Sequence, residues 1–125
     1  MEQKGKINSF EDLIVWQKAI DLSVLVYKKT EKFPKEEMFG LTSQIRRASN
    51  SVSLNISEGS VKTTKGFINQ LTIAHGSAAE VLSASILANR LGFINQDDLQ
   101  SARNQVSEVT KMLNSLISSL EKRVN

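Results

Sequence analysis

The chain has 125 residues, of which 40% are hydrophobic and 23% are charged. These values are typical of one globular domain, which we assign to residues 1–125. There is no cysteine, so a disulfide framework and a thiolate metal site are excluded, and a cytoplasmic protein is favoured. The net charge is +3, and residues 28–65 carry eight basic against four acidic side chains, so the basic excess lies in that segment.

The first helix is predicted over residues 9–33. Residues 1–8 are polar, lack the apolar core of a signal peptide, and are expected to be flexible. Asn8 or Ser9 can begin the helix as an N-cap, since each is followed three residues later by an acidic side chain. Pro34 disfavours helical geometry at the residue before it and therefore ends the helix. The apolar positions at helical spacing are Leu13, Trp16, Ile20, Val24 and Tyr27.

A second helix is predicted over residues 39–59. This segment is rich in Ser and Asn, whose side chains compete for backbone hydrogen bonds and weaken the helical propensity. The apolar spacing nevertheless favours a helix, and Gly59 is interpreted as its C-terminal stop. The residues assigned to its apolar face are Leu41, Ile45, Ala48, Val52 and Ile56.

A third helix is predicted over residues 64–91, with Thr63 or Thr64 at its start. It has two apolar seams, and a helix that is apolar on two sides is normally buried on two sides, which predicts a partner chain. Polar side chains spread through the helix argue against a membrane span. The first seam comprises Phe67, Leu71, Ala74, Ala78, Val81, Ser85 and Ala88. The second comprises Ile73, Ser77, Glu80, Ala84, Leu87 and Leu91.

The fourth helix is predicted over residues 95–122. Gly92 ends the helix before it, Asn95 is the N-cap, and Asp97 and Asp98 complement the positive end of the helix dipole. Four helices joined by short connections predict an all-α protein, an antiparallel up-down four-helix bundle. The heptad of the fourth helix is Leu99, Ala102, Val106, Val109, Leu113, Leu116 and Leu120.

The residues give little support for catalysis. His75 is the only histidine, so zinc-protease and di-iron histidine motifs are absent, and we predict no catalytic residue, metal or cofactor. Glu80 falls on an apolar seam, where a carboxylate needs partners. We favour a structural polar network or a subunit interface, for example with Arg46 or Arg47, over a ligand or metal site. The residues of this predicted network are Asn55, Glu58, Ser77 and Glu80.

The basic side chains of the middle segment allow two interpretations. They can be a solvated face, since lysines near a helix C-terminus are favoured by its dipole, or they can bind phosphate. No aromatic stacking motif accompanies them, so reading of single-stranded bases has no support in the sequence. The candidate nucleic-acid-binding residues are Arg46, Arg47, Lys62 and Lys65, with Lys28, Lys29 and Lys32 as secondary candidates.

An ordered set of motifs over residues 10–120 resembles the proteins encoded in intervening sequences of bacterial large-subunit ribosomal RNA genes, a family related to the accessory proteins of diversity-generating retroelements. The segment Asn55-Ile56-Ser57-Glu58-Gly59 is similar to that family's Asn-Ile-Ala-Glu-Gly signature, with Ser57 in place of Ala. The other matching segments are residues 10–13, 15–19, 33–37, 39–48, 73–80 and 90–94.

The resemblance implies a four-helix bundle that assembles as a homopentameric barrel without enzymatic activity. In the retroelement branch it implies binding to a reverse transcriptase and to nucleic acid. Our leading hypothesis is a homo-oligomeric scaffold that binds RNA or DNA, with structured RNA favoured, through a basic surface repeated by symmetry. The alternative is a protein-interaction module, for example for a reverse transcriptase. A third hypothesis is an enzyme or ligand site around Glu58, His75 and Glu80.

Overall fold

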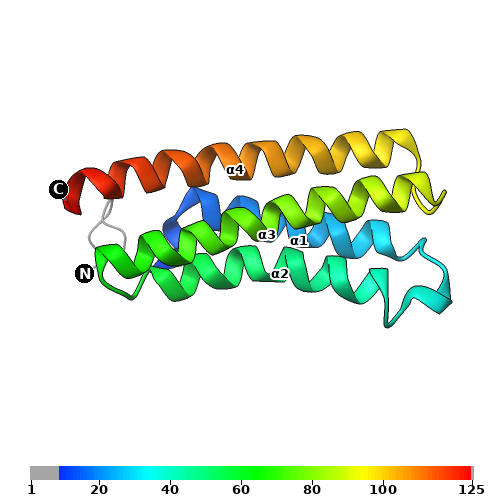
Figure 1. Ribbon diagram of the computed structural model, residues 1–125, viewed down its shortest axis with the longest axis horizontal. Coiled ribbons are helices and arrows are strands. Elements are labelled where there is room, and N and C mark those ends of the chain that lie inside the picture. Colours follow the sequence, from blue (N-terminus) through cyan, green and yellow to red (C-terminus); the bar gives the residue numbers. More distant parts are fainter. Residues whose placement is uncertain (1–8, 125) are drawn as a thin grey trace.

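The computed structural model describes residues 9–124, which form four long α-helices and two short 3-10 turns. The helices lie side by side, and the chain direction reverses from each helix to the next (Figure 1). The described residues contain no strand, and the predicted all-α four-helix bundle is confirmed. The elements are η1 (Phe10–Asp12), α1 (Ile14–Thr30), η2 (Lys35–Glu37), α2 (Leu41–Gly59), α3 (Thr64–Arg90) and α4 (Gln96–Val124).

The first helix is shorter than predicted at both ends. Ser9 caps the 3-10 turn η1 by accepting a hydrogen bond from the Glu11 N–H, and Leu13 then has extended backbone before α1 begins. At the other end the Thr30 hydroxyl donates to the Val26 carbonyl, and the chain tightens into a turn. The predicted cap at Asn8 and the flexibility of residues 1–8 lie outside the described residues.

The predicted apolar stripe of the first helix is only partly confirmed, because Leu13 and Trp16 pack against the core but the later positions do not. Val24 and Tyr27 are exposed, while the residues that enter the core lie on a neighbouring face of the helix. Because α1 is apolar on several sides, spacing alone does not choose between faces. The Arg46 guanidinium instead lies over the aromatic ring of Tyr27, 4.6 Å from the centroid of that ring. The buried stripe is Val15, Ala19, Leu22 and Val26.

The second helix begins two residues later than predicted, at Leu41. Gly40 precedes it, and the Glu37 carboxylate accepts a hydrogen bond of 3.0 Å from the Leu41 N–H, so a side chain from the preceding turn caps the helix. Its predicted apolar face is confirmed, because Leu41, Ile45, Ala48, Val52 and Ile56 are all buried.

Gly59 ends α2 as predicted, but for a different physical reason. Among the described residues only Gly92 has a positive φ, so Gly59 is not a left-handed cap. A methyl group at Gly59 would lie 2.8 Å from both the Phe67 ring and the Gln70 Cβ of α3. The glycine therefore allows α2 and α3 to approach closely, and it fixes where Phe67 lies.

The caps of the last two helices are confirmed. Thr63 accepts a hydrogen bond from the Gly66 N–H at the start of α3. At its end Gly92 has φ +82°, and the Phe93 N–H bonds to the Ala88 carbonyl, which is a Schellman arrangement. The Asn95 side chain caps α4 by accepting from the Asp98 N–H at 2.8 Å.

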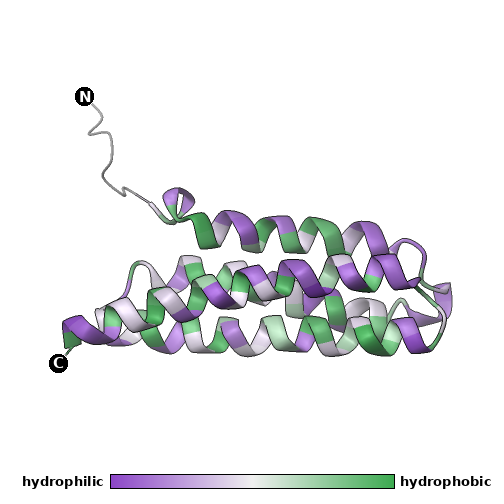
Figure 2. Ribbon diagram, turned by 90° about the horizontal axis from the view of Figure 1, so that it is seen from above, coloured by the Kyte–Doolittle hydropathy of each residue, from purple (hydrophilic) through white to green (hydrophobic). Residues whose placement is uncertain are grey.

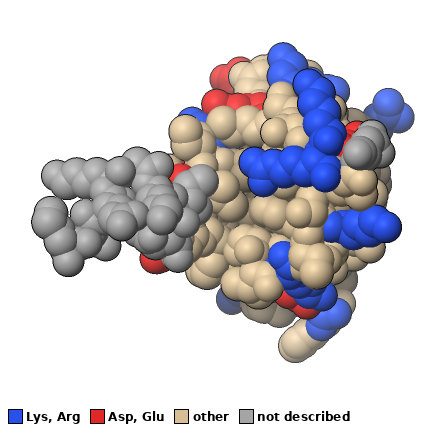
Figure 3. Space-filling view, turned by 90° about the vertical axis from the view of Figure 1, so that its left-hand side faces the viewer, with Lys and Arg blue, Asp and Glu red and all other residues tan. Residues whose placement is uncertain are grey.

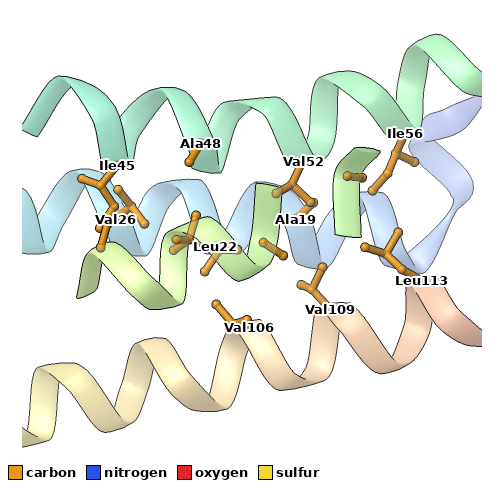
Figure 4. Close-up of a cluster of buried hydrophobic side chains, with 14 of the residues drawn as sticks. Ala19, Leu22, Val26, Ile45, Ala48, Val52, Ile56, Val106, Val109 and Leu113 are labelled. Atoms are coloured by element: carbon orange, nitrogen blue, oxygen red, sulfur yellow. The ribbon is translucent and has the colours of Figure 1, made fainter. Parts of the chain in front are cut away.

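The core runs along the middle of the bundle. Figure 4 shows residues of α1, α2 and α4 pointing toward one another, and Figure 2 shows apolar residues interleaved with polar ones along the helices. The first seam of α3 faces this core, where only Phe67 is partly exposed, and the heptad of α4 is likewise buried apart from Leu116.

By length and composition α3 could also cross a membrane, but core helices of water-soluble proteins pass the same test.

Replacement of Gly59 by Ala is expected to destabilise the fold, because the new methyl would press on Phe67 and on the rigid Cβ of Gln70. We expect a loss of about 1–3 kcal/mol in the free energy of unfolding, measured by urea denaturation. Ser57→Ala, two residues earlier on the same helix, is the matched control and should change it by less than about 0.5 kcal/mol. Equal stability of the two variants would contradict the close-packing role of Gly59.

Candidate nucleic-acid interface

The predicted basic residues lie near opposite ends of the bundle. Lys28, Lys29 and Lys32 lie at or just after the end of α1, and Arg46 and Arg47 lie early in α2. The other two, Lys62 and Lys65, lie at the connection from α2 to α3. Most of the length of α2, about 20 Å, separates the two groups. The seven residues therefore do not form one continuous patch within one chain.

Two of the secondary candidates are bound by a buried acid. Lys29 Nζ lies 2.7 Å from Asp98 Oδ1, and Lys32 Nζ lies 3.0 Å from Asp98 Oδ2. Asp98 is only 5% exposed and pins the start of α4 to the end of α1. The hydrogen bond from Lys29 lowers the pKa of Asp98 to about 2; burial opposes this shift, and Lys32 and the Asn95 N–H support it. Lys29 and Lys32 thus have a structural role that the sequence did not reveal.

Arg46 is also engaged within the chain. Its guanidinium stacks on Tyr27 and donates a 2.9 Å hydrogen bond to the Thr30 hydroxyl, which joins α2 to α1. Lys28 and Arg47 are exposed and have no ion-pair or hydrogen-bond partner within residues 9–124. Of the five candidates at this end, only these two are free to meet a ligand.

The opposite end carries a second group of basic side chains. Lys62 and Lys65 are exposed there, and the last turn of α4 adds Lys122 and Arg123 (Figure 3). We call these four residues the basic end face. Lys62 pairs with Glu58 at 3.6 Å, but both side chains are largely exposed, and such surface pairs are weak. Sequence reasoning missed Lys122 and Arg123 because they are about 60 residues away from Lys62 in the chain.

A pocket of about 420 Å³ opens at the basic end face. Its walls come from η1, the α2–α3 connection, the start of α3 and the end of α4, and Arg123 is part of its lining. Two aromatic residues, Phe10 and Phe67, also line it. The sequence shows no aromatic stacking motif with the basic residues, although Phe67 lies two residues after Lys65, and the fold places Phe10 in the same pocket as Phe67. We call this hollow the end pocket.

Three of the residues assigned to a polar network or a subunit interface, Asn55, Glu58 and Ser77, make hydrogen bonds within and between α2 and α3. Gln70 Nε2 donates to Asn55 Oδ1 at 2.8 Å and to Glu58 Oε1 at 3.1 Å. Asn55 also donates to the Ser51 hydroxyl, which in turn accepts from Ser77 at 2.9 Å. Ser51 and Gln70 were missed, although Ser51 lies one helical turn before Asn55 and Gln70 lies two turns before Ser77.

Glu80 does not belong to that network. It lies ten residues after Gln70, which is about 15 Å along α3, and it is exposed. It lines a shallow depression together with Phe39 and Arg47. Glu58 and Glu80 therefore do not converge with His75 on a shared site. Within residues 9–124 no group of three or more acidic, His or Cys side chains could hold a metal.

The second predicted seam of α3 is largely exposed. Ser77 and Ala84 are buried, but Ile73 is 51% and Leu87 is 49% exposed, and Leu91 is similar. Gly76 lies on the same side, and a methyl group there would meet no atom within 4 Å. We call Ile73, Gly76, Glu80, Leu87 and Leu91 the outer stripe of α3.

The ion pairs of Asp98 predict a specific loss of stability in acid. The pKa of Asp98 is lowered in the folded state, so its contribution is present above about pH 4 and is lost as pH falls toward 2. Asp98→Asn should lower the free energy of unfolding at neutral pH by about 2 kcal/mol and flatten its decline between pH 4 and 2. Asp97→Asn, at the exposed neighbouring position, is the control, measured by urea unfolding. An unaltered acid profile in Asp98→Asn would rule out this role.

Comparisons with known proteins agree on the family. The family model for the 23S rRNA-intervening sequence protein matches residues 11–115. A solved structure of a protein with unknown function from the S23 ribosomal protein family of Bacteroides thetaiotaomicron is similar, with a TM-score of 0.76 and 28% identity over 82% of this chain and 97% of that chain. No curated protein matches the sequence. The chain therefore belongs to the 23S rRNA-intervening sequence protein family.

Proposed function

We propose that the protein is a non-catalytic cytoplasmic scaffold that binds nucleic acid, with structured RNA as the preferred ligand, through the basic end face. The observation that carries this proposal is the convergence of Lys62, Lys65, Lys122 and Arg123 from two chain segments onto one end of the bundle. Several cations on one surface attract the phosphate backbone without regard to sequence. The candidates at the other end contribute less, because Lys29, Lys32 and Arg46 are bound within the fold.

The proposal includes assembly of an antiparallel bundle into a homopentameric barrel, as the family resemblance implies. Its physical support is the outer stripe of α3, which leaves large apolar side chains in water. Gly76 adds to this support. A glycine inside a helix lowers its stability, and no atom of the described subunit lies within 4 Å of where a Cβ would be. Close approach of a neighbouring chain would explain why the position is occupied by glycine. Assembly would repeat the basic end face around the symmetry axis.

A protein-interaction module is the alternative, and one observation favours it. Phe39 is 96% exposed beside the depression that contains Arg47 and Glu80. Aromatic and arginine side chains are enriched at protein interfaces, and Phe39 and Arg47 line this depression together. A reverse transcriptase is one candidate partner. A partner that stays bound in a pull-down after nuclease treatment would favour this alternative, and loss of every partner would count against it.

Neutralising the basic end face should weaken RNA binding. We expect Lys62→Gln with Lys65→Gln to lower the affinity for a structured RNA on the order of tenfold at moderate salt, and to reduce the slope of log affinity against log salt. Lys28→Gln with Lys35→Gln removes the same charge at the other end and is the control. Binding would be measured by fluorescence anisotropy over a salt series. No binding to structured RNA even at low salt would refute the proposal.

Assembly through α3 is tested by placing a bulky side chain where the lone subunit has open space. Wild-type protein is expected to have about five times the 13.9 kDa mass of one chain in light scattering. Gly76→Leu should yield smaller species while helicity by circular dichroism is retained, because a Cβ at this exposed position meets no atom of its own subunit within 4 Å. Ser107→Leu, exposed on α4, is the comparison variant. A monomeric wild-type protein at micromolar concentration would contradict the assembly.

A further inference from the structure

We propose that the end pocket receives one unpaired nucleobase of the bound RNA. This inference rests on the proposed function and names the part of the ligand that the basic end face would recognise. A pocket of about 420 Å³ with mostly apolar walls is large enough for a small planar ring system. RNA presents such rings at bulges and loops, where bases are free to leave the helical stack.

The aromatic walls of the end pocket are held in place by packing. The Phe10 ring meets Trp16 edge-on, with ring centroids 5.1 Å apart and planes at 63°. The Phe67 ring lies against α2 at the position where only Gly59 leaves room for it. Fixed rings lose little conformational entropy when a ligand stacks on them. Stacking on aromatic side chains is the usual way in which proteins hold unpaired bases.

The end pocket and the cations around it suit the two parts of a nucleotide, its base and its phosphate. A nucleotide needs an apolar place for its base and cations for its phosphate. Arg123 is part of the pocket lining, and Lys62 and Lys65 flank the α2–α3 connection that contributes Val61 to the wall. Glu58 offsets part of the Lys62 charge but belongs to an exposed pair that a phosphate can displace.

The polar groups of the end pocket indicate recognition by shape rather than by base identity. The Ser60 hydroxyl already donates to the Ser57 carbonyl, and the Ser9 hydroxyl accepts from the Glu11 N–H. Few free donors or acceptors are therefore left to read the edge of a base. We expect a preference for unpaired over paired bases, with weak discrimination among the four bases.

An apolar side chain of a protein partner would use the aromatic walls but would leave the cations without a counterpart. A nucleotide would use the aromatic walls through its base and the cations through its phosphate.

The test uses two RNA hairpins that contain the fluorescent base 2-aminopurine, either as a single bulge or paired within the stem. The wild-type protein should bind the bulged RNA about tenfold more tightly and change its fluorescence. Phe67→Leu and Phe10→Leu remove an aromatic face but keep an apolar side chain. They should lower the affinity for the bulged hairpin to that for the paired hairpin and so abolish the preference. Phe39→Leu, at the other end of the molecule, should keep the preference.

Val61→Met gives an independent check that does not depend on core packing and adds no aromatic face. Val61 is 83% exposed and lines the end pocket, so a longer side chain there should leave folding intact while it narrows the pocket, and a weaker preference is expected. Equal binding of both hairpins without a fluorescence change would overturn base insertion and leave the proposed function standing. Failure to bind either hairpin at low salt would overturn both.

Discussion

The close approach of α2 to α3 at Gly59 is the contact on which the candidate interface depends. Small side chains let the two helices approach, and the hydrogen bonds through Ser51, Asn55, Gln70 and Ser77 set their register. Residues that lower the helical propensity of α2 are thus the same residues that tie it to its neighbour. This contact also holds Phe67 at the wall of the end pocket. A residue larger than glycine at this point would move the aromatic ring and the pocket with it.

The two ends of the bundle are built differently. At one end the Phe33 and Phe93 rings pack 5.5 Å apart, and buried Asp98 binds Lys29 of α1 and Lys32 just after α1. Lys29 and Lys32 at that end are therefore engaged in ion pairs that join the end of α1 to the start of α4. At the other end no such lid is formed by the described residues, and apolar walls open between cationic side chains. This asymmetry is the reason for placing the RNA-binding function at the basic end face.

Helix existence and core faces followed from the sequence where one face was clearly apolar. The seams of α2 and α4 were predicted residue by residue, because a single 3-4 spacing admitted one assignment. The stripe of α1 was only partly right because several spacings fitted equally well, and only packing selected Val15, Ala19, Leu22 and Val26. Its ends were wrong because Ser9 and Thr30 made local hydrogen bonds that a capping pattern does not distinguish from a long helix.

Only part of the candidate site could be predicted from the sequence. Lys62 and Lys65 were identified from local charge, but Lys29 and Lys32 could not be recognised as partners of Asp98, which is 66 residues away from Lys32. The sequence by itself determined the four helices, most of their caps and the family. Only the tertiary structure decided which cations remain free and which aromatic rings lie beside them. Charge and helical periodicity are properties of local segments, whereas a binding surface is made where distant segments meet.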